Sequence, residues 1–479
     1  MKERGSFYFG SELKMFFGAG FGHSLNINSI KDFLMQGYIN NPETALNKIQ
    51  QLEPGMVLEI SHKLKTRKSK IQNNLFKKNN AKINSNTKDA FLYDSLANAV
   101  KRQLVSDTEV GLLLSSGIDS MAILTILREL GELERIKTYT ATFDEKGFSE
   151  HQVVTKLAKE WGFKNKLITI TEDLIINNFE NCIRCFDNLE MLPTCLNMYL
   201  MPKCIDDDVK VLLSGVGGDE LFYGYPTHAA SNFIIQNPKL SYLLSLVGKP
   251  FVDSSLINSK VYMSFLEKLS RFASGYNSDF RIAHLNWRQI FNEDELLSLL
   301  KGELNKSNGC IELRLKYFHE AQLLGMSGYE QLAYVDMKTW LVDCGLMMWD
   351  KGGMASSKEI RVPFLDLQFN EELKAVPYGC LASKIGTKQT LKGLFSDKLP
   401  DFVTKVPKQG FQAPITSWMQ GKLGRLIKEY TYQLPEKLFD HKTIDKLWDA
   451  NNNGRGNASL KLWTLGSLSA WIYFNKIKL

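Results

Sequence analysis

Two stretches rich in serine and glycine contain the residue types that bind phosphate groups. The first, residues 115–120, reads SSGIDS and follows the short apolar run at residues 110–114. The apolar residues after it recur with helical spacing, so a strand is expected to turn sharply into a helix here. Such a turn points backbone N–H groups and the positive end of the helix at one spot, which favours an anion, most often phosphate. It is not a Walker loop, and an ordinary strand–turn–helix connection is the alternative.

The second stretch, residues 214–225, reads SGVGGDELFYGY and also follows an expected strand, at residues 210–213. Asp119 and Asp219 therefore both come shortly after strands. If these strands are parallel, both carboxylates lie at the same edge of the sheet, near the bound phosphates. Carboxylate oxygens are hard ligands that suit Mg²⁺, so the pair predicts a magnesium site. The alternative for Asp219 is a cap on the helix that follows, and the two roles are compatible.

The elements that must position these residues alternate between strands and helices. The expected strands are residues 110–114, 136–143, 166–170 and 210–213, and the expected helices are residues 91–105, 149–161 and 173–186. This alternation predicts an α/β fold with a doubly wound parallel sheet, whose ligands sit beyond the carboxyl ends of the strands. The long stretch that follows, residues 226–330, is predicted to be helical and carries no motif that we can interpret.

The positive charge of the chain is concentrated in one tract. The 479 residues carry a net charge of +7, and residues 63–88 contain nine lysines and arginines and no acid. Subtracting these nine leaves −2 for the rest of the chain, so the composition does not indicate a nucleic-acid-binding protein. The tract is also rich in asparagine, which predicts a solvated linker. A phosphate-rich or membrane-surface partner for this tract is the alternative.

The cellular setting follows from the apolar residues and the cysteines. No apolar run approaches the length of a membrane span, and the first residues do not form a signal peptide. The seven cysteines are scattered, as is usual in a reducing compartment. Cys182 and Cys185 form a single C-x-x-C and are expected to be two half-buried thiols. We therefore expect a cytoplasmic protein without a membrane partner.

Four sequence blocks resemble those of the asparagine synthetases. Residues 115–120 resemble the pyrophosphate loop (S-G-G-x-D-S) of the N-type ATP pyrophosphatases, with Ser116 in place of one glycine, and residues 214–225 resemble the family's S-G-x-G signature. Residues 334–366 and 388–418 resemble two further blocks of the family. The resemblance covers most of residues 91–475. It implies a PP-loop fold of the adenine nucleotide alpha hydrolase type with a large helical C-terminal part.

The resemblance also implies an activity. Relatives use ATP and Mg²⁺ to adenylate a carboxylate, and ammonia or another amine then forms an amide as AMP and pyrophosphate are released. Lys408 falls on a lysine that contacts phosphate and the adenylated intermediate in relatives, and Asp119 and Asp219 fall at the magnesium site. The residues implied to bind the nucleotide are Leu113, Ser115, Ser116, Gly117, Asp119, Ser120, Ala141, Gly215, Gly217 and Asp219.

One position departs from the family at the second half-reaction. Relatives have glutamate, aspartate or tyrosine as the third residue of S-G-x-G, where it helps to activate the nucleophile, and this chain has Val216. The partner acid of relatives is expected to survive as Asp343. Glu220 or Glu359 are candidates to replace the missing acid, although Glu359 is also placed to pair with Arg361. An ammonia-using enzyme would tolerate the loss, and a loss of catalysis is the other alternative.

The N-terminal residues carry a smaller resemblance. Residues 1–60 resemble the tail of the family's Ntn-type glutaminase sandwich, but no cysteine occurs before Cys182 and residue 2 is a lysine. We therefore expect a truncated remnant without glutaminase activity, packed on the next domain. The predicted organisation is this remnant, a basic linker at residues 61–90 and the ligase domain at residues 91–479.

Three functions stay open from the sequence. The first is a ligase lacking its own glutaminase, with free ammonia, another amine or ammonia from a separate glutaminase subunit. Its acceptor is aspartate, a uronic sugar, a peptide side chain or a secondary-metabolite acid. The second is a non-catalytic nucleotide-binding subunit that docks a partner enzyme, and the third is a cyclase that forms an amide within one substrate. A homo-oligomer is compatible with each.

Overall fold

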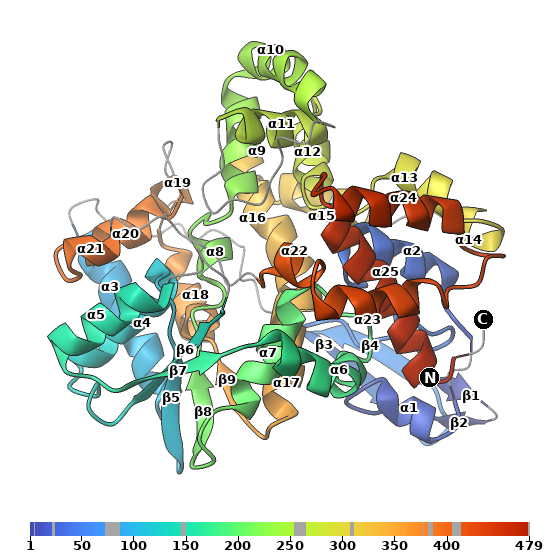
Figure 1. The fold of residues 1–479 in the computed structure, drawn as a ribbon. Helices are drawn as coiled ribbons and strands as arrows, with labels where there is room; N and C mark the ends of the chain where they lie inside the picture. Colours follow the sequence, from blue (N-terminus) through green and yellow to red (C-terminus); the bar gives the residue numbers. More distant parts are fainter. Residues whose placement is uncertain are drawn as a thin grey trace.

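The computed structural model of the protein describes all residues except 4, 22–23, 72–86, 145–149, 253–264, 307–310, 377, 382–386, 405–412 and 478–479. A parallel sheet with its covering helices occupies one part of the molecule, and a helical part continues from it to the C-terminus (Figure 1). None of the helices in the described ranges is both long and apolar enough to cross a membrane.

The sheet has five strands in the order β7-β6-β5-β8-β9, and every neighbouring pair is parallel. Four strands confirm the prediction from the sequence: β5 (Glu109–Leu113), β6 (Lys137–Thr142), β7 (Asn165–Thr169) and β8 (Val209–Leu213). The fifth, β9 (Glu359–Arg361), was not predicted. It is only three residues long, and its sequence EIR lacks the apolar run that marks a buried strand.

Helices cover both faces of the sheet, as a doubly wound fold requires. Successive residues of β8 point to opposite sides, since Val211 and Leu213 join one apolar cluster and Leu212 joins the other. The predicted helix register is also confirmed, because the apolar face of the first helix is buried. The covering helices are α3 (Lys88–Gln103), α4 (Ile118–Glu129), α5 (Glu150–Trp161), α6 (Glu172–Cys185) and α7 (Thr194–Lys203).

A helical projection rises from the molecule after the second loop (Figure 1). It contains α9 (Pro226–Gln236), α10 (Pro238–Gly248), α11 (Phe265–Gly275) and α12 (Phe280–Asn286), and α16 (Gly328–Lys338) runs beneath it. The closing helix predicted at residues 462–474 is α25 (Ala458–Phe474), which is buried on nearly all sides. The remaining helices are α8 (Gly218–Leu221), η1 (Lys249–Phe251), α13 (Glu293–Leu299), α14 (Glu303–Lys306), α15 (Ile311–Leu323), η2 (Leu341–Leu346), α17 (Met347–Met354), η3 (Pro363–Leu365), α18 (Leu367–Leu373), α19 (Tyr378–Leu381), α20 (Gln389–Phe395), α21 (Asp401–Thr404), α22 (Ile415–Trp418), α23 (Lys422–Thr431) and α24 (His441–Asn452).

The N-terminal residues pack on the rest of the chain, as expected. They form β1 (Lys2–Glu3), β2 (Ser6–Phe7), α1 (Lys14–Gly18) and α2 (Ile27–Gln36), and α2 shares one apolar core with α25. The docking also has polar contacts. The backbone N–H of Lys14 donates to Asp187 over 2.7 Å, and the backbone N–H of Ala45 donates to the Asn188 side chain over 2.8 Å.

Part of the predicted linker is a strand. β3 (Met56–Ile60) and β4 (Thr66–Lys70) pair in an antiparallel hairpin, and Lys68 forms an ion pair with Glu53 over 3.0 Å. The charged sequence TRKSK of β4 gives no apolar alternation, because its side chains are mostly exposed. The middle of the basic tract, residues 72–86, lies outside the described residues.

Candidate active site

The loop between β5 and α4 is closed by two serine hydroxyls. The backbone N–H of Ser115 donates to Ser120 Oγ over 3.1 Å, and Ser120 Oγ lies 3.1 Å from the carbonyl oxygens of Ser115 and Gly117. Gly117 is the cap residue of the helix, which begins at Ile118. Ser116 Oγ is buried without a hydrogen-bond partner among the described residues. The loop therefore offers a free hydroxyl beside the positive end of a twelve-residue helix.

Glycines let the second loop pack directly on the first. A Cβ atom at Gly215 would lie 2.8 Å from the Cβ of Asp119, and one at Gly218 would lie 2.5 Å from Asp119 Oδ1. Gly217 has a φ of +94°, a conformation that favours glycine. Because β5 and β8 are adjacent and parallel, these loops leave the same edge of the sheet. Their glycines then allow close contact between them.

A lysine joins the two carboxylates that the sequence placed at this edge. Lys388 Nζ forms ion pairs with Asp119 Oδ2 and with Asp219 Oδ1, the latter at 2.5 Å. The Lys388 side chain is 1% exposed, and its backbone is in the left-handed region with φ of +55°. Sequence reasoning missed this residue, although it opens the block at residues 388–418. The lysine chosen instead, Lys408, lies outside the described residues.

The paired carboxylates fit a divalent cation. Asp119 and Asp219 converge on a single positive group, and hard carboxylate oxygens are the donors that Mg²⁺ takes. Space for this arrangement comes from Gly224, where a Cβ atom would lie 1.8 Å from Asp219 Oδ1 and 2.1 Å from Lys388 Cε. The cap of α8 is Gly217, so Asp219 does not serve as its N-cap.

The residues expected at the adenosine site lie at neighbouring strand ends. Leu113 is the last residue of β5, Ala141 lies at the end of β6, and Gly215 follows β8. These three strands are adjacent in the sheet. The structure therefore groups all three positions at the edge that carries the two loops.

A buried acid lies directly after Asp219. Glu220 is 2% exposed, and its Oε1 accepts a hydrogen bond from the Tyr225 hydroxyl over 2.6 Å. Trp340 Nε1 donates to the same hydroxyl over 2.8 Å. Burial, followed by the charge of Asp219, raises the pKa of Glu220 to about 7. Glu220 thus titrates near neutral pH and lines a cavity of about 480 Å³.

The same cavity holds Asp343 at another wall. Its Oδ2 accepts from Asn40 Nδ2 over 2.7 Å, and its Oδ1 accepts from Asn41 Nδ2 over 2.5 Å. Burial raises the pKa of Asp343 to about 6 even though these hydrogen bonds act in the opposite direction. The N-terminal residues therefore hold one of the predicted acids in position.

Glu359 and Val216, unlike Glu220 and Asp343, do not line this cavity. Glu359 Oε1 lies 2.9 Å from Arg361 Nε, and the Glu359 side chain is 59% exposed. Arg361 also donates to the backbone carbonyls of Gln103 and Val105. These contacts are those of the surface ion pair that was the alternative for Glu359. Val216 packs against the apolar core and offers no proton acceptor.

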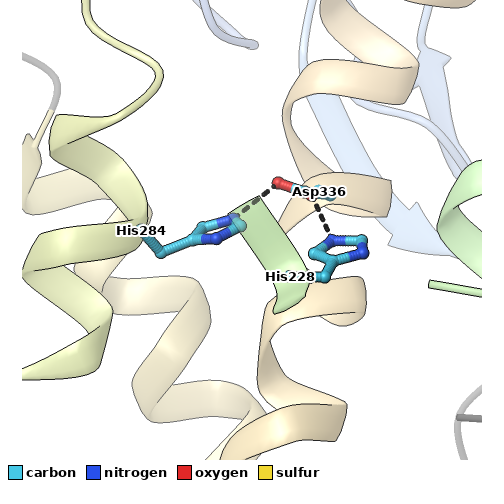
Figure 2. A group of neighbouring side chains, drawn as sticks. All are labelled: His228, His284 and Asp336. Carbon is cyan, nitrogen blue, oxygen red and sulfur yellow. Dashed lines mark hydrogen bonds and ion pairs between the residues drawn. The ribbon is translucent and has the colours of Figure 1, made fainter. Parts of the chain in front are cut away.

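Two histidines of the helical projection, on α9 and α12, meet an aspartate of α16 (Figure 2). His228 Nε2 lies 2.7 Å from Asp336 Oδ2, and His284 Nε2 lies 3.1 Å from Asp336 Oδ1. The three side chains offer the ligand atoms that a metal ion would need. Arg288, however, also forms an ion pair with Asp336 Oδ2. The guanidinium of Arg288 already supplies the positive charge that a metal ion would bring. We therefore interpret the cluster as a hydrogen-bonded ion pair.

The cluster of His228, His284 and Asp336 is connected to Glu220 through the aromatic ring of Tyr225. The guanidinium of Arg288 lies 4.7 Å from the ring centroid of Tyr225, whose hydroxyl binds Glu220. Burial would raise the pKa of Asp336, but the charge of Arg288 and the two histidine hydrogen bonds hold it well below its usual range. The helical projection is thereby tied to the loop that carries Glu220.

Comparisons with known proteins match nearly the whole chain. The model of the asparagine synthase family matches residues 92–473. Glutamine-hydrolyzing asparagine synthetase 1 of Bacillus subtilis (strain 168) is 26% identical over 480 residues, which cover 98% of this chain and 72% of that protein. Glutamine-hydrolyzing asparagine synthetase 3 of the same strain is 23% identical over 484 residues, covering 94% and 69%. Amidase ChyE of Penicillium rubens is 22% identical over 372 residues, covering 70% and 53%.

Replacement of Lys388 by methionine leaves two close carboxylates without their shared cation. We expect Lys388→Met to lower the free energy of unfolding by about 3 kcal/mol in the absence of metal, as for other broken buried pairs. Mg²⁺ should then raise the melting temperature of the variant more than that of the wild type. Lys398→Met is the matched control, because Lys398 pairs with Glu129 at the surface and should cost less than about 1 kcal/mol. Equal Mg²⁺ effects on variant and wild type would contradict this account.

His284 gives the stability a pH dependence. Burial is the largest effect on this imidazole and lowers its pKa to about 4, whereas an unfolded histidine titrates near 6.5. The unfolded state therefore binds more protons below pH 6.5, and the free energy of unfolding falls as the pH falls. We expect a contribution of about 2 kcal/mol between pH 7 and pH 5.

Urea unfolding of wild type and His284→Gln at pH 7 and pH 5 measures this contribution as the difference between their pH dependences. His441→Gln is the control at a partly exposed histidine that bonds to the Leu434 carbonyl. A pH dependence of His284→Gln equal to that of the wild type would refute the assignment.

Proposed function

The chain belongs to the asparagine synthase family, and on this premise we propose that it is an ATP-dependent ligase that adenylates a carboxylate and forms an amide. Transfer to AMP turns a poor electrophile into a mixed anhydride with a good leaving group, and pyrophosphate departs. The observation that carries the proposal is the convergence of Asp119 and Asp219 on one positive charge beside the loop at residues 115–120. A site of this kind can neutralise the charge that develops on pyrophosphate.

The residues of the two loops have distinct roles in this proposal. The loop at residues 115–120 acts as the pyrophosphate loop, with the helix end and Ser116 Oγ as donors. Mg²⁺, held by Asp119 and Asp219, would neutralise charge on the phosphate oxygens when bound. Lys388 holds these carboxylates together when no metal is bound, and Lys408 stays a predicted contact to phosphate and to the adenylated intermediate. Leu113, Ala141 and Gly215 would then line the adenosine site.

Glu220 is the best placed proton acceptor for the attacking nitrogen. Its carboxylate lines the cavity, titrates near pH 7 and receives one hydrogen bond from Tyr225. Asp343 lines the same cavity, but its two oxygens already accept hydrogen bonds from Asn40 and Asn41. We therefore assign proton transfer to Glu220 and a supporting position to Asp343. Glu359 is the weaker candidate, since it is exposed and paired with Arg361.

The cavity beside Glu220 bears on the substrate. Its walls combine leucines such as Leu221 and Leu341 with charged side chains of both signs, among them Lys316, Lys374 and Glu320. Apolar walls with a few charged groups, lysines among them, favour an acid that has an apolar part as well as a carboxylate. We propose a carboxylate of this class as the acceptor. Ammonia or another amine is the nitrogen source, and residues 1–60, which would correspond to the tail of a glutaminase domain, form one wall through Asn41.

Release of pyrophosphate tests the function directly. The wild-type protein should release pyrophosphate from ATP and Mg²⁺ when a suitable carboxylate is added, and ammonium should then yield the amide. Asp119→Asn should lose at least 10²-fold in rate, because the site loses one of its two charged ligands. Candidate acids with apolar parts are compared with aspartate. ATP binding without pyrophosphate release for any acid would favour a non-catalytic, nucleotide-binding subunit.

Glu220→Gln separates the two half-reactions. We expect the variant to keep carboxylate-dependent exchange of pyrophosphate into ATP, while amide formation falls by about 10²–10⁴-fold, the usual contribution of a general base. In the wild type, amide formation should rise with pH through about 7 as Glu220 loses its proton. Glu359→Gln is the matched control and should leave both rates unchanged. A Glu220→Gln enzyme with normal amide formation would refute the assignment.

A further inference from the structure

The helix α10 has its small residues inside and its large apolar residues outside. Ser241, Ser245 and Gly248 are buried and recur at helical spacing. A Cβ atom at Gly248 would lie 2.6 Å from the Cβ of Ala273, so α10 and α11 pack very closely at this point. The side of α10 that meets the protein is thus made of its smallest side chains.

The outer side of α10 is strongly apolar. Its large exposed side chains are between 43% and 58% accessible, and they are Leu240, Tyr242, Leu243, Leu246 and Val247. Phe265 and Leu266 continue this set at the start of α11, with Phe265 73% exposed. Other exposed apolar side chains are spread over the described surface, so this concentration needs an explanation.

The charges around these side chains are positive. Within residues 238–252 and 265–275 the exposed charged side chains are Lys239, Lys249, Lys268 and Arg271. The acid in these ranges, Glu267, is buried. α10 also lies at the outer end of the helical projection, away from the sheet (Figure 1). The surface is therefore apolar and basic and lies at the outer end of the projection.

We propose that α10 and the start of α11, here called the projection face, bind the surface of an anionic lipid bilayer. Amphipathic helices with basic ends lie in the interface and place their apolar side chains between the head groups. Lys239 and Lys249 stand at the two ends of α10, where they would meet lipid phosphates, and Tyr242 suits the interface. A helix that lies in the interface needs no membrane-spanning run. A search of the sequence for such a run therefore could not reveal this binding.

A second copy of the chain fits the face less well. Symmetric dimers bring the same patch of both subunits together, so the lysines and Arg271 of one copy would face those of the other. An anionic bilayer offers opposite charge to the same residues. Charge complementarity therefore favours the lipid surface.

Co-sedimentation of the full chain with vesicles tests the proposal. The wild type should bind vesicles of phosphatidylcholine with phosphatidylserine and should bind pure phosphatidylcholine weakly. Leu243→Ser/Leu246→Ser/Val247→Ser should reduce binding at least tenfold while keeping every charge. Lys239→Glu/Lys249→Glu should also weaken it, by about fivefold or more for each lysine.

Two controls make the result specific to the projection face. Leu297→Ser/Leu323→Ser removes exposed leucines of α13 and α15 and should bind as the wild type does. Lys63→Glu/Lys65→Glu/Arg67→Glu changes the basic tract, whose charge alone can attract anionic vesicles, and should leave the apolar contribution intact. Normal binding by the triple serine variant, or loss of binding only in the basic-tract variant, would overturn the proposal. So would a wild type that ignores vesicles but dimerises through these side chains in light scattering.

Discussion

The ion pairs of Lys388 with Asp119 and Asp219 hold the two loops of the site together. Two carboxylates that share a small space repel one another, and they stay ionised together only with positive charge between them. Lys388 supplies this charge from a position 269 residues after Asp119. Three distant segments are therefore fixed to one point. The loops keep their close arrangement as long as a cation occupies that point, whether an ammonium or a metal.

The close packing of these segments explains why the second loop contains several glycines. Gly215, Gly218 and Gly224 lie where any Cβ atom would enter the volume of Asp119, Asp219 or Lys388. These glycines are thus needed for contacts with the first loop and with Lys388, and the local turn alone does not explain them. Val216 stands between Gly215 and Gly217, and its partly buried side chain packs against the apolar core. The loop therefore keeps its packing role at a position that carries no acid.

The sequence predicted the elements whose signal is local. The apolar runs of β5, β6, β7 and β8 and the periodicity of α3 correctly gave a parallel sheet covered on both faces. It missed β9 and β4, whose residues are charged and whose pairing partners are distant or exposed. It also missed Lys388, because a lysine that neutralises two acids is recognised only when the fold brings them together. The docking of Asn40 and Asn41 on Asp343 belongs to the same long-range class.

The helical projection also contacts the site over a long sequence distance, although it carries no motif. Asp336 holds Arg288, Arg288 lies on the ring of Tyr225, and the hydroxyl of Tyr225 binds Glu220. His228 and His284 hydrogen-bond to the Asp336 carboxylate from two helices. A shift of these helices would therefore move the partner that orients Glu220. The projection face and the contacts that lead to Glu220 therefore belong to one set of packed helices.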